Sequence, residues 1–485
     1  MTSSTPRQDP NPHGRYHLLI VGAGPTGLIA AQTAVSQGAR VALIERNLLG
    51  GTCLNTGCIP SKTIIRTSRL YRDMRDAELF GAQVPSGITV DFPAVMERVR
   101  RVRARLTERV SAERLVAMGI DVYFGEARFA GRDSVTVGAK VLRFKNALIA
   151  TGARPVRPPI PGIEEAGFLT YENVFDLTER PKRLLVIGGG PVGCELAQAF
   201  ARLGSRVTLV QDESMFLVHE ERDAAQLLSD ALARDGIEIH LDTQTTRVRV
   251  QGDDTIVDLV NSDTTRTVAV DRILVGVGTV PNVQGLGLEA ASVAYDGARG
   301  IRVDDFLRTT NRRIFAAGDV CTENKFPHIE SVAGRIVTSN ALFWGRERLS
   351  AQAVPWCTFT DPEIAHVGMY VTEARQKNIP VKTFTVLMHE VDRAIADSEE
   401  DGFVKLTVRE GTAKILGATV VARHAGDLIN EISLAMSAGL DLHALARANQ
   451  PFPTQSQAIK MAAEAYVQSR SNPLRTWLRT KRLSW

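Results

Sequence analysis

Residues 17–27 read HLLIVGAGPTG, and this short stretch decides how the first part of the chain folds. Its apolar run predicts a buried strand, and the glycines with their proline predict a tight turn after it. Apolar residues then recur at helical spacing over 28–37, and 41–44 (VALI) indicate a second buried strand, which is followed by Glu45. A strand, a glycine turn, a helix and a second strand followed by an acid together predict a dinucleotide-binding unit.

Each glycine of the turn has its own expected role. Gly22 permits the tight turn, Gly24 lets a pyrophosphate approach the backbone, and Gly27 lets the helix pack closely on the sheet. Phosphates bind at the N-terminus of such a helix, because its free N–H groups and its dipole favour negative charge. We expect Glu45 to accept hydrogen bonds from a ribose.

The same order of elements recurs further along the chain. A strand over 184–187 leads into a glycine turn over 188–193, a helix over 195–203 and a strand over 207–210. The residues at the matching positions are Gly188, Gly190, Gly193 and Gln211. A chain with two such units is expected to bind two dinucleotides. The expected pairing is a flavin dinucleotide held permanently and a nicotinamide dinucleotide that exchanges.

Position 211 bears on which nicotinamide coenzyme is used. An acid there would hold the ribose hydroxyls and repel a 2′-phosphate, whereas an arginine would bind that phosphate. Gln211 does neither, and Asp212 and Glu213 follow it. The sequence therefore leaves NADH and NADPH as alternatives.

Two cysteines stand close together directly after the first unit. Residues 50–62 read GGTCLNTGCIPSK, with Cys53 and Cys58 five positions apart. The chain has only five cysteines, too few for a disulfide framework, so this spacing indicates a reactive pair. The cysteine spacing, the flanking glycines and the Pro-Ser-Lys ending together resemble the FAD-dependent disulfide reductases, the class I pyridine nucleotide-disulfide oxidoreductases. That family includes dihydrolipoamide dehydrogenase, glutathione reductase and mercuric reductase.

The resemblance implies a role for each residue around this pair. Cys53 would be the exposed thiol that exchanges with the substrate, and Cys58 would lie against the flavin and exchange electrons with it. A disulfide that touches the flavin ring can accept two electrons, and one thiolate can then attack the substrate. Lys62 matches a lysine beside the flavin, and Glu195 matches the acid that pairs with it.

The resemblance extends over nearly the whole chain. Residues 150–155 match the segment that crosses from the FAD unit into the nicotinamide unit, and 276–282 match the return. Residues 316–319 match the second FAD element, in which Asp319 would bond the ribitol chain. The other residues that the resemblance places at the cofactors are Gly51, Thr52, Thr151 and Gly152 for FAD, and Gly278 for the nicotinamide coenzyme.

The expected fold is α/β, with two Rossmann-like dinucleotide-binding domains and a C-terminal α+β dimerisation domain. A length of 485 residues suggests about three domains. Residues from about 354 onward, with Phe-Thr-Asp-Pro at 359–362, resemble the family's dimerisation domain. Members of the family are homodimers whose active site borrows residues from the partner subunit. The expected ranges are 1–155 and 282–352 for the two parts of the FAD domain, 156–281 for the NAD(P) domain, 353–470 for the dimerisation domain and 471–485 for a basic tail.

One stretch departs from the family's disulfide-reducing members. They carry His-Pro-Thr-x-x-Glu near the C-terminus, and the histidine, held by the glutamate, moves protons on the substrate thiols. Here residues 452–457 read FPTQSQ, so Phe452 and Gln457 stand at the two positions. Phenylalanine cannot titrate, and glutamine cannot act as an orienting carboxylate. This argues against efficient turnover of lipoamide or glutathione disulfide.

The resemblance to mercuric reductase accommodates that departure, because that enzyme has an aromatic residue at the position of Phe452. The expected function is therefore NAD(P)H:acceptor oxidoreduction, most like the reduction of Hg(II) to Hg(0). Cys53 and Cys58 would bind the metal transiently, since soft thiolates suit a soft ion. Residues 479–485 contain no cysteine, whereas mercuric reductase has a terminal cysteine pair that passes metal to the inner pair. A divergent relative is expected for that reason.

Three rival functions stay open at this point. The first is disulfide reduction of the dihydrolipoamide dehydrogenase or glutathione reductase type. The second is reductive attack on a small carbon electrophile, since losing the acid protects a nucleophilic intermediate from protonation. The third is a nucleotide-responsive regulatory module without catalysis, which the intact cysteine pair, Lys62 and both glycine turns disfavour.

Composition limits the partners and the compartment. A net charge of +4 is small for this length and does not point to nucleic acid. The polar leader, 1–14, and the glycines after it argue against a signal peptide, and we expect a cytoplasmic protein. The tail after Arg470 is basic, but it is too short to anchor firmly, so no membrane contact is expected there.

Overall fold

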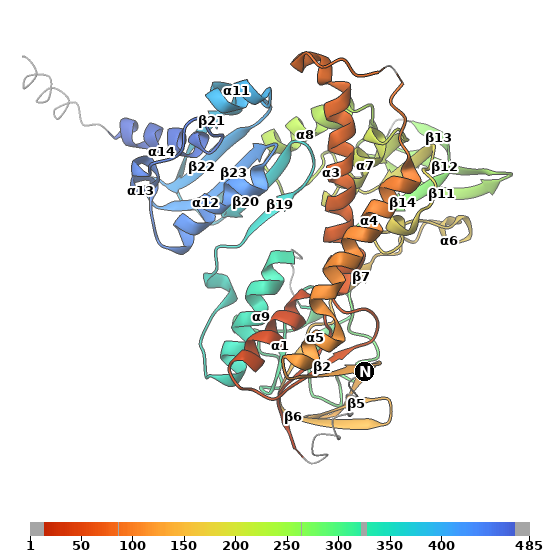
Figure 1. Ribbon diagram of the computed structural model, residues 1–485, viewed down its shortest axis with the longest axis vertical. Helices are drawn as coiled ribbons and strands as arrows, with labels where there is room; N and C mark the ends of the chain where they lie inside the picture. Colours follow the sequence, from red (N-terminus) through yellow and green to blue (C-terminus); the bar gives the residue numbers. More distant parts are fainter. Residues whose placement is uncertain (1–13, 86, 263, 322–326, 471–485) are drawn as a thin grey trace, which may run out of the picture. The chain divides into compact units, whose positions relative to one another are not determined.

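The computed structural model describes residues 14–85, 87–262, 264–321 and 327–470, and the basic tail expected over 471–485 lies outside them. The chain forms two compact units, each assembled from separate stretches (Figure 1). The first takes in Met1–Pro60, Glu97–Val156 and Gly278–Ala351, and the second Ser61–Met96, Arg157–Val277 and Gln352–Trp485. Among the described residues, no helix has both the length and the apolar character needed to cross a membrane.

A seven-stranded sheet forms the centre of the first unit. Its order is β3-β2-β1-β6-β5-β4. The seventh strand, β18, pairs with the C-terminal residues of β6 on the side opposite to β1. The strands are β1 (Tyr16–Val21), β2 (Val41–Glu45), β3 (Ile120–Phe124), β4 (Ala127–Gly131), β5 (Ser134–Val137), β6 (Lys140–Ile149) and β18 (Ile314–Ala316). The pairs among β3, β2, β1, β6 and β18 are parallel, whereas β4 and β5 extend the sheet as an antiparallel hairpin. Helices α1 (Pro25–Ser36) and α9 (Pro327–Leu342) pack side by side against it (Figure 1).

The second unit contains a four-stranded parallel sheet of the same kind. Its order is β10-β9-β8-β14, and the glycine turn between β8 and α7 repeats that between β1 and α1. These elements are β8 (Arg183–Ile187), α7 (Pro191–Arg202), β9 (Arg206–Val210), α8 (Arg222–Arg234), β10 (Glu238–His240) and β14 (Arg272–Val275). A separate three-stranded antiparallel sheet, β11 (Gln244–Gln251), β12 (Asp254–Val260) and β13 (Thr265–Val270), accompanies it.

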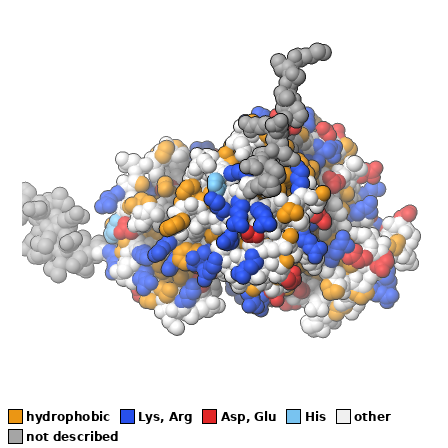
Figure 2. Space-filling view, turned by 90° about the horizontal axis from the view of Figure 1, so that it is seen from below, with side chains coloured by type: hydrophobic (Ala, Val, Ile, Leu, Met, Phe, Trp, Pro, Cys, Tyr) orange, Lys and Arg blue, Asp and Glu red, His pale blue; other side chains and the backbone are white. Residues whose placement is uncertain are grey.

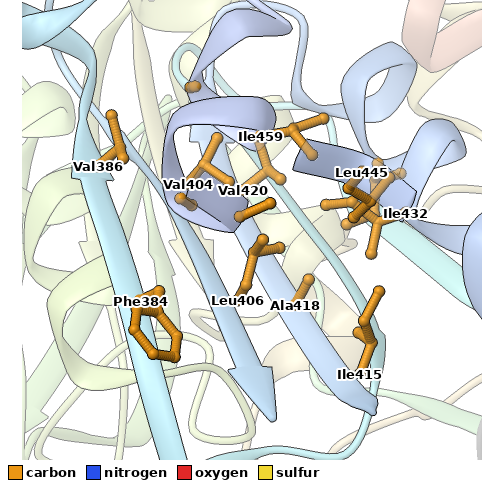
Figure 3. Close-up of a cluster of buried hydrophobic side chains, with 14 of the residues drawn as sticks. Phe384, Val386, Val404, Leu406, Ile415, Ala418, Val420, Ile432, Leu445 and Ile459 are labelled. Carbon is orange, nitrogen blue, oxygen red and sulfur yellow. The ribbon is translucent and has the colours of Figure 1, made fainter. Parts of the chain in front are cut away.

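The C-terminal part of the second unit is a five-stranded antiparallel sheet with helices on it. The order is β19-β20-β23-β22-β21. The elements are β19 (Pro355–Thr358), β20 (Glu363–Gly368), β21 (Val381–Leu387), β22 (Phe403–Arg409), β23 (Ile415–Ala422), α12 (Ala425–Ser437), α13 (Leu442–Arg447) and α14 (Gln457–Ser469). Side chains of the strands, such as Leu406 and Val420, pack with Ile432 and Ile459 of the helices in one buried cluster (Figure 3). This is the expected α+β arrangement, and burial of its apolar face holds sheet and helices together.

The described surface mixes both signs of charge. In the view of Figure 2, lysine and arginine side chains occur in small groups among polar and apolar ones, and acidic side chains lie between them. This pattern agrees with the small net charge of +4.

The expected strands and helices of both nucleotide units are present, but the helices start earlier than expected. Helix α1 begins at Pro25 and α7 at Pro191, each three or four residues before the apolar periodicity starts. Proline suits the first helical position, because the N–H it lacks would have no partner within the helix there. The sequence pattern places both prolines in the turn, whereas in the structure each is the first residue of its helix.

Both turns require glycine because backbone segments approach each other closely. A Cβ on Gly27 would lie 1.9 Å from the carbonyl oxygen of Gly22, and a Cβ on Gly193 would lie 1.9 Å from that of Gly188. Gly22 has a φ of 106°, a conformation that residues with side chains rarely adopt. In each unit, the helix can therefore pack this closely on its turn only because the glycine in its first turn, Gly27 or Gly193, has no side chain.

We predict that Gly27→Ala destabilises the protein by at least about 2 kcal/mol, because the added methyl group meets backbone that cannot move aside. The measurement is the unfolding midpoint of the cofactor-free protein in urea. Gly38→Ala is the control. Beyond its two chain neighbours, no described residue has an atom within 4 Å of the position of a Gly38 Cβ, and Gly38 follows α1 on the surface. Strain in Gly38→Ala arises only from a φ of 83°, so this variant should lower the free energy of unfolding by less than Gly27→Ala does. An equal decrease in the two variants would contradict the steric explanation.

Candidate active site

The residues expected to bind FAD follow the ends of four strands of the first unit. Glu45 ends β2, Gly22 follows β1, Thr151 follows β6, and Asp319 follows β18. These strands are parallel neighbours, so their carboxyl ends lie along one edge of the sheet. Ligands of open α/β sheets bind in the crevice at this edge. The fold therefore brings together residues that lie far apart in the sequence.

Hydrogen bonds fix the shape of this edge. The Glu45 carboxylate accepts the backbone N–H of Ala23 at 2.8 Å, which ties the end of β2 to the glycine turn. Thr151 donates its hydroxyl to the carbonyl oxygen of Asn282 at 2.8 Å, and the Asn282 amide donates to the carbonyl oxygen of Thr151 at 3.0 Å. This reciprocal pair joins the outgoing and returning chain segments. Asn282 was matched to the return segment in the sequence, but its side-chain role was not foreseen.

The turn has room and polar groups for a pyrophosphate. Apart from Gly24 and its two chain neighbours, no described residue has an atom within 4 Å of the place where a Cβ on Gly24 would stand, so this backbone is open on its ligand side. A Cβ on Gly51 would stand 2.7 Å from the Gly24 Cα, so the backbones at Gly51 and Gly24 can lie this close only because Gly51 has no side chain. The buried hydroxyl of Thr26, in the first turn of α1, has no hydrogen-bond partner among the described residues. An open turn, an unpartnered hydroxyl and a helix N-terminus fit a bound dinucleotide phosphate.

The cysteine pair lies in two successive helices. Cys53 is in α2 (Gly51–Asn55), Cys58 is the first residue of α3 (Cys58–Arg75), and both are partly exposed. Buried Asn55 donates its amide to the carbonyl oxygens of Leu49 and Gly51, at 3.0 and 2.9 Å, and so fixes the segment that carries Cys53. The N-terminus of α3 favours negative charge at Cys58. Asn55 was not among the residues expected to matter.

The second glycine turn repeats the first in detail. Gly188 has the same φ of 106°, and the Gly189 N–H donates to Oε1 of Gln211 at 2.6 Å. Gln211 therefore ties the second strand of its unit to the turn, as Glu45 does in the first unit. Gly278 lies in the first unit, directly after the boundary between the units.

Lys62 and Glu195 form a short ion pair in the second unit. The Lys62 Nζ lies 3.1 and 2.9 Å from the two carboxylate oxygens of Glu195, and the Glu195 residue is only 5% exposed. Phe359, from the segment after β19, holds both partners. Its N–H donates to Glu195 at 2.9 Å, and Lys62 stands 4.5 Å from the centre of its ring. A buried carboxylate keeps its charge only when such partners satisfy it.

Two further residues on the face of α7 that carries Glu195 contact the segment after β19. Gln198 donates to the carbonyl oxygen of Asp361 at 2.9 Å and accepts the Asp361 N–H at 2.7 Å. Arg202 donates to the Asp361 carboxylate at 2.7 Å and to Asp235 at 2.8 Å. Glu195, Gln198 and Arg202 follow one another at helical spacing, so they lie on one face of α7. The spacing of these three polar residues is the signal in the sequence that indicates this face.

Burial and neighbouring arginines together shift the pKa values of two carboxyl groups near this network in opposite directions. Burial raises the pKa of Asp361, but Arg202 and Arg69 outweigh that effect and hold the pKa below its usual value. Burial also raises the pKa of Glu363, and there Arg69, whose guanidinium lies 2.9 Å away, offsets it only in part. Cys357 lies close to Glu363, and burial raises the pKa of its thiol well above the usual value. A thiol in this state is protonated and a poor nucleophile.

Phe452 stands apart from these buried groups. It lies in the loop between α13 and α14 and is 70% exposed, and Gln457 is the first residue of α14. The loop is held by Gln450, which donates to Glu431 at 3.0 Å, and by Gln455, which donates to Glu399 at 2.6 Å. Phe452 is thus a large apolar side chain presented by an anchored loop.

Two dinucleotide-binding units and a paired-cysteine segment define the class of flavoprotein oxidoreductases with a redox-active disulfide. The profile of the pyridine nucleotide-disulphide oxidoreductases matches residues 16–337, and that of their dimerisation domain matches residues 354–463. The chain belongs to this family, whose members are FAD-dependent and use NAD(P)H as electron donor.

Individual relatives carry several names. The mercuric reductase of Streptomyces lividans is 35% identical over 461 residues, which are 94% of this chain and 97% of the relative. The dihydrolipoyl dehydrogenase of Geobacillus stearothermophilus is 34% identical over 451 residues, 92% of this chain and 95% of the relative. The Cu(II) complex of RclA, an HOCl-induced flavoprotein disulfide reductase from Escherichia coli, is similar with a TM-score of 0.82 and 29% identity, over 93% of this chain and 99% of RclA.

We predict that Gly24→Ala leaves the stability of the cofactor-free protein nearly unchanged but weakens FAD binding at least about tenfold, because the methyl group enters the open side of the turn. The backbone at Gly24 has a φ of −72°, which alanine adopts without strain. The measurements are the unfolding midpoint of the cofactor-free protein and a fluorescence titration with FAD. Unchanged FAD affinity would contradict the placement of the pyrophosphate.

Asp361→Asn should lower the free energy of unfolding by about 1–3 kcal/mol at pH 7, because an ionised hydrogen-bond partner of Arg202 is lost. The folded-state pKa of Asp361 lies below the unfolded value of about 4, so its contribution is present above that pH and is lost as pH falls through the folded value. The difference in Tm between wild type and variant should therefore shrink on acidification.

The control for this variant is Asp401→Asn, which removes an exposed partner of Arg234. We expect a cost of less than about 1 kcal/mol there. Equal effects of the two variants, or a difference at Asp361 that does not change with pH, would contradict the role given to the buried pair.

Proposed function

We propose that this protein is an NAD(P)H:acceptor oxidoreductase that passes electrons out through Cys53 and Cys58, and that its acceptor is Hg(II), as in mercuric reductase. Phe452 is the observation that carries the choice of acceptor. The family's disulfide-reducing members have an acid–base histidine at this position, and an exposed phenyl ring cannot transfer a proton. Reduction of a metal ion needs no such proton, because the product Hg(0) takes up none, whereas a reduced disulfide must be protonated to give its thiols.

The residues of this chain would divide the work as follows. Bound FAD would accept a hydride from the nicotinamide and supply an electron pair at the cysteines. Cys58, at the start of α3, would lie at the flavin, and Cys53 would meet the acceptor. Lys62 would place its positive charge beside the flavin, and Glu195 and Phe359 hold its ammonium group in position. Overall, NAD(P)H and Hg(II) would give NAD(P)⁺, a proton and Hg(0).

The cysteine pair also suits the proposed acceptor chemically. Thiolate sulfur is a soft ligand, and soft metal ions prefer it to oxygen ligands. Both cysteines are partly exposed, so an ion can reach them. Among the residues that the structure describes, no group of three or more His, Cys, Asp or Glu side chains could hold a metal ion elsewhere. Several mercuric reductases are 33–35% identical to this chain, which is compatible with the same choice.

A homodimer in the cytoplasm is part of this proposal. The chain carries the family's dimerisation domain, and an anchored loop presents Phe452 on the surface of that part of the chain. In the assembled protein, Phe452 of one subunit would lie near Cys53 of the other. A reducing compartment would let NAD(P)H keep the pair reduced between turnovers.

Disulfide reduction is the second candidate function, favoured by the similarity to dihydrolipoyl dehydrogenase. The double variant Phe452→His, Gln457→Glu would restore the missing acid–base pair. Under our proposal, wild type reduces lipoamide poorly, and the double variant raises that rate by about 10²–10⁴-fold, the usual contribution of a positioned acid–base group. The measurement is NADH-coupled lipoamide reduction. Fast reduction by the wild type would make Hg(II) the wrong acceptor.

The direct test is oxidation of NADH and of NADPH by FAD-loaded protein, with Hg(II) supplied as a thiol complex. We expect metal-dependent turnover that Cys58→Ser abolishes. Cys194→Ser is the matched control: this thiol is fully buried and donates to a backbone oxygen, which serine can also do. No metal-dependent turnover in the wild type, or turnover retained in Cys58→Ser, would reject the proposal.

A further inference from the structure

The residue that contacts the second glycine turn, Gln211, carries no charge. The residue after the second strand of a dinucleotide unit lies at the adenosine ribose, and an acid there contacts the ribose hydroxyls. In Gln211, Oε1 is occupied by the Gly189 N–H at 2.6 Å, so the Nε2 group is left as a neutral donor. Gln211 can therefore bind a ribose oxygen but neither repels nor neutralises a 2′-phosphate.

Unpaired carboxylates follow directly. Asp212 and Glu213 are both exposed, and neither carboxylate has a hydrogen bond or an ion pair to any described residue. Asp242, after β10, is also exposed and likewise has no side-chain partner among the described residues. We call these three residues the acidic rim. The segment 207–221 contains no lysine or arginine that could neutralise it.

Backbone hydrogen bonds keep the acidic rim beside Gln211. The Thr243 N–H donates to the carbonyl oxygen of Gln211 at 2.9 Å, and the Asp242 N–H donates to that of Glu213 at 3.0 Å. The segments after β9 and β10 are therefore joined at the edge where the ribose is expected. Because the two segments are joined, a negatively charged ligand group cannot push one of them aside without moving the other.

The far end of the same loop is fixed as well. The ring of Phe216 fills the place of a side chain on Gly189, at 2.5 Å from where its Cβ would be, and the Leu217 N–H donates to the Gly189 carbonyl oxygen at 3.1 Å. Glu220 is held by the indole N–H of Trp356 at 2.9 Å and by the hydroxyl of Tyr370 at 2.6 Å. The loop thus closes back on the coenzyme turn.

Glu221 and Glu238, two other acidic residues of this region, are already paired. Glu221 bonds to Lys405, so it adds no free negative charge. On β10 and β13, Arg266 donates to Glu238 at 2.6 Å, and the His240 ring contacts the same carboxylate at 3.2 Å. His219 and Arg222 are exposed, but they follow the buried Phe216 and Leu217 at the far end of the loop.

From this arrangement we infer that the second unit takes NADH in preference to NADPH, with the acidic rim excluding the 2′-phosphate. The inference rests on the proposed function, in which this unit binds the nicotinamide coenzyme, and it names the coenzyme. A 2′-phosphate carries close to two negative charges at neutral pH and would face two or three carboxylates without a counter-ion. Repulsion of this kind across a few ångströms of water corresponds to a preference of at least about tenfold.

The test measures binding rather than turnover. FAD-loaded protein is titrated by calorimetry with adenosine 5′-monophosphate and with adenosine 2′,5′-bisphosphate, which differ by the 2′-phosphate alone. We expect the monophosphate to bind at least about tenfold more tightly at low ionic strength. Added salt should bring the affinities of the monophosphate and the bisphosphate closer together, because the carboxylates are exposed and salt screens their charge. A purely steric exclusion would not respond to salt.

Two variants separate the acidic rim from the general charge of the protein. Asp212→Asn with Glu213→Gln should bring the two affinities to within about threefold of each other. Asp253→Asn neutralises another exposed carboxylate of this unit, at the opposite end of β11, and should leave the ratio as in the wild type. Tighter binding of the bisphosphate by the wild type, or an unchanged ratio in the double variant, would overturn the inference.

The outcome is independent of the acceptor. Failure of Hg(II) reduction would reject the proposed acceptor while the affinity ratio could still be measured. If neither nucleotide binds, this turn is not the nicotinamide coenzyme site, and the preference for NADH fails with it. As a second readout, NADH should bleach the flavin anaerobically at concentrations at least about tenfold lower than NADPH does.

Discussion

A missing side chain is the constraint on which both nucleotide sites depend. Where each helix leaves its glycine turn, a single added carbon would stand 1.9 Å from a carbonyl oxygen of the turn itself. Strand and helix can approach to this distance only because Gly27 and Gly193 have no Cβ. The approach aims the helix N-terminus at the edge where the parallel strands end, and a negatively charged ligand group is most stable there. The two units share this geometry and differ in the residue that ties the second strand to the turn, Glu45 in one and Gln211 in the other.

The second unit adds a buried polar network around Lys62. Its members come from α3, from one face of α7 and from the segment 359–361, and each charged group has an opposite charge or a backbone partner. Burial of ions costs free energy unless such partners are in place, so this network fixes geometry more than it adds stability. It holds the ammonium group of Lys62 between a carboxylate and an aromatic ring. A lysine placed in this way can act on a redox site only if all three segments keep their positions.

The sequence was sufficient for the parts of this account that depend on local pattern. The glycine turns and their strands follow from spacing within about thirty residues, and the structure confirms them. The helices begin three or four residues before the apolar periodicity does, because proline suits the first helical position as well as it suits a turn. The pairing of Lys62 with Glu195 was expected only through the family resemblance, since nothing local relates two residues 133 positions apart. The contacts of Phe359 and Asp361 with α7 were missed altogether. They join residues more than 150 positions apart, and single-sequence periodicity carries no information on such pairings.

In the function proposed above, electrons leave the protein through Cys53 and Cys58. The most direct test is to treat FAD-loaded protein anaerobically with one equivalent of NADH, alkylate it with a labelled maleimide and locate the label by mass spectrometry. The account predicts that reduction adds label at Cys53 and Cys58, while Cys194, buried in the start of α7, stays unlabelled with or without NADH. A flavin that bleaches while the labelling of Cys53 and Cys58 stays unchanged would contradict it, because the electrons would then have to leave from the flavin itself.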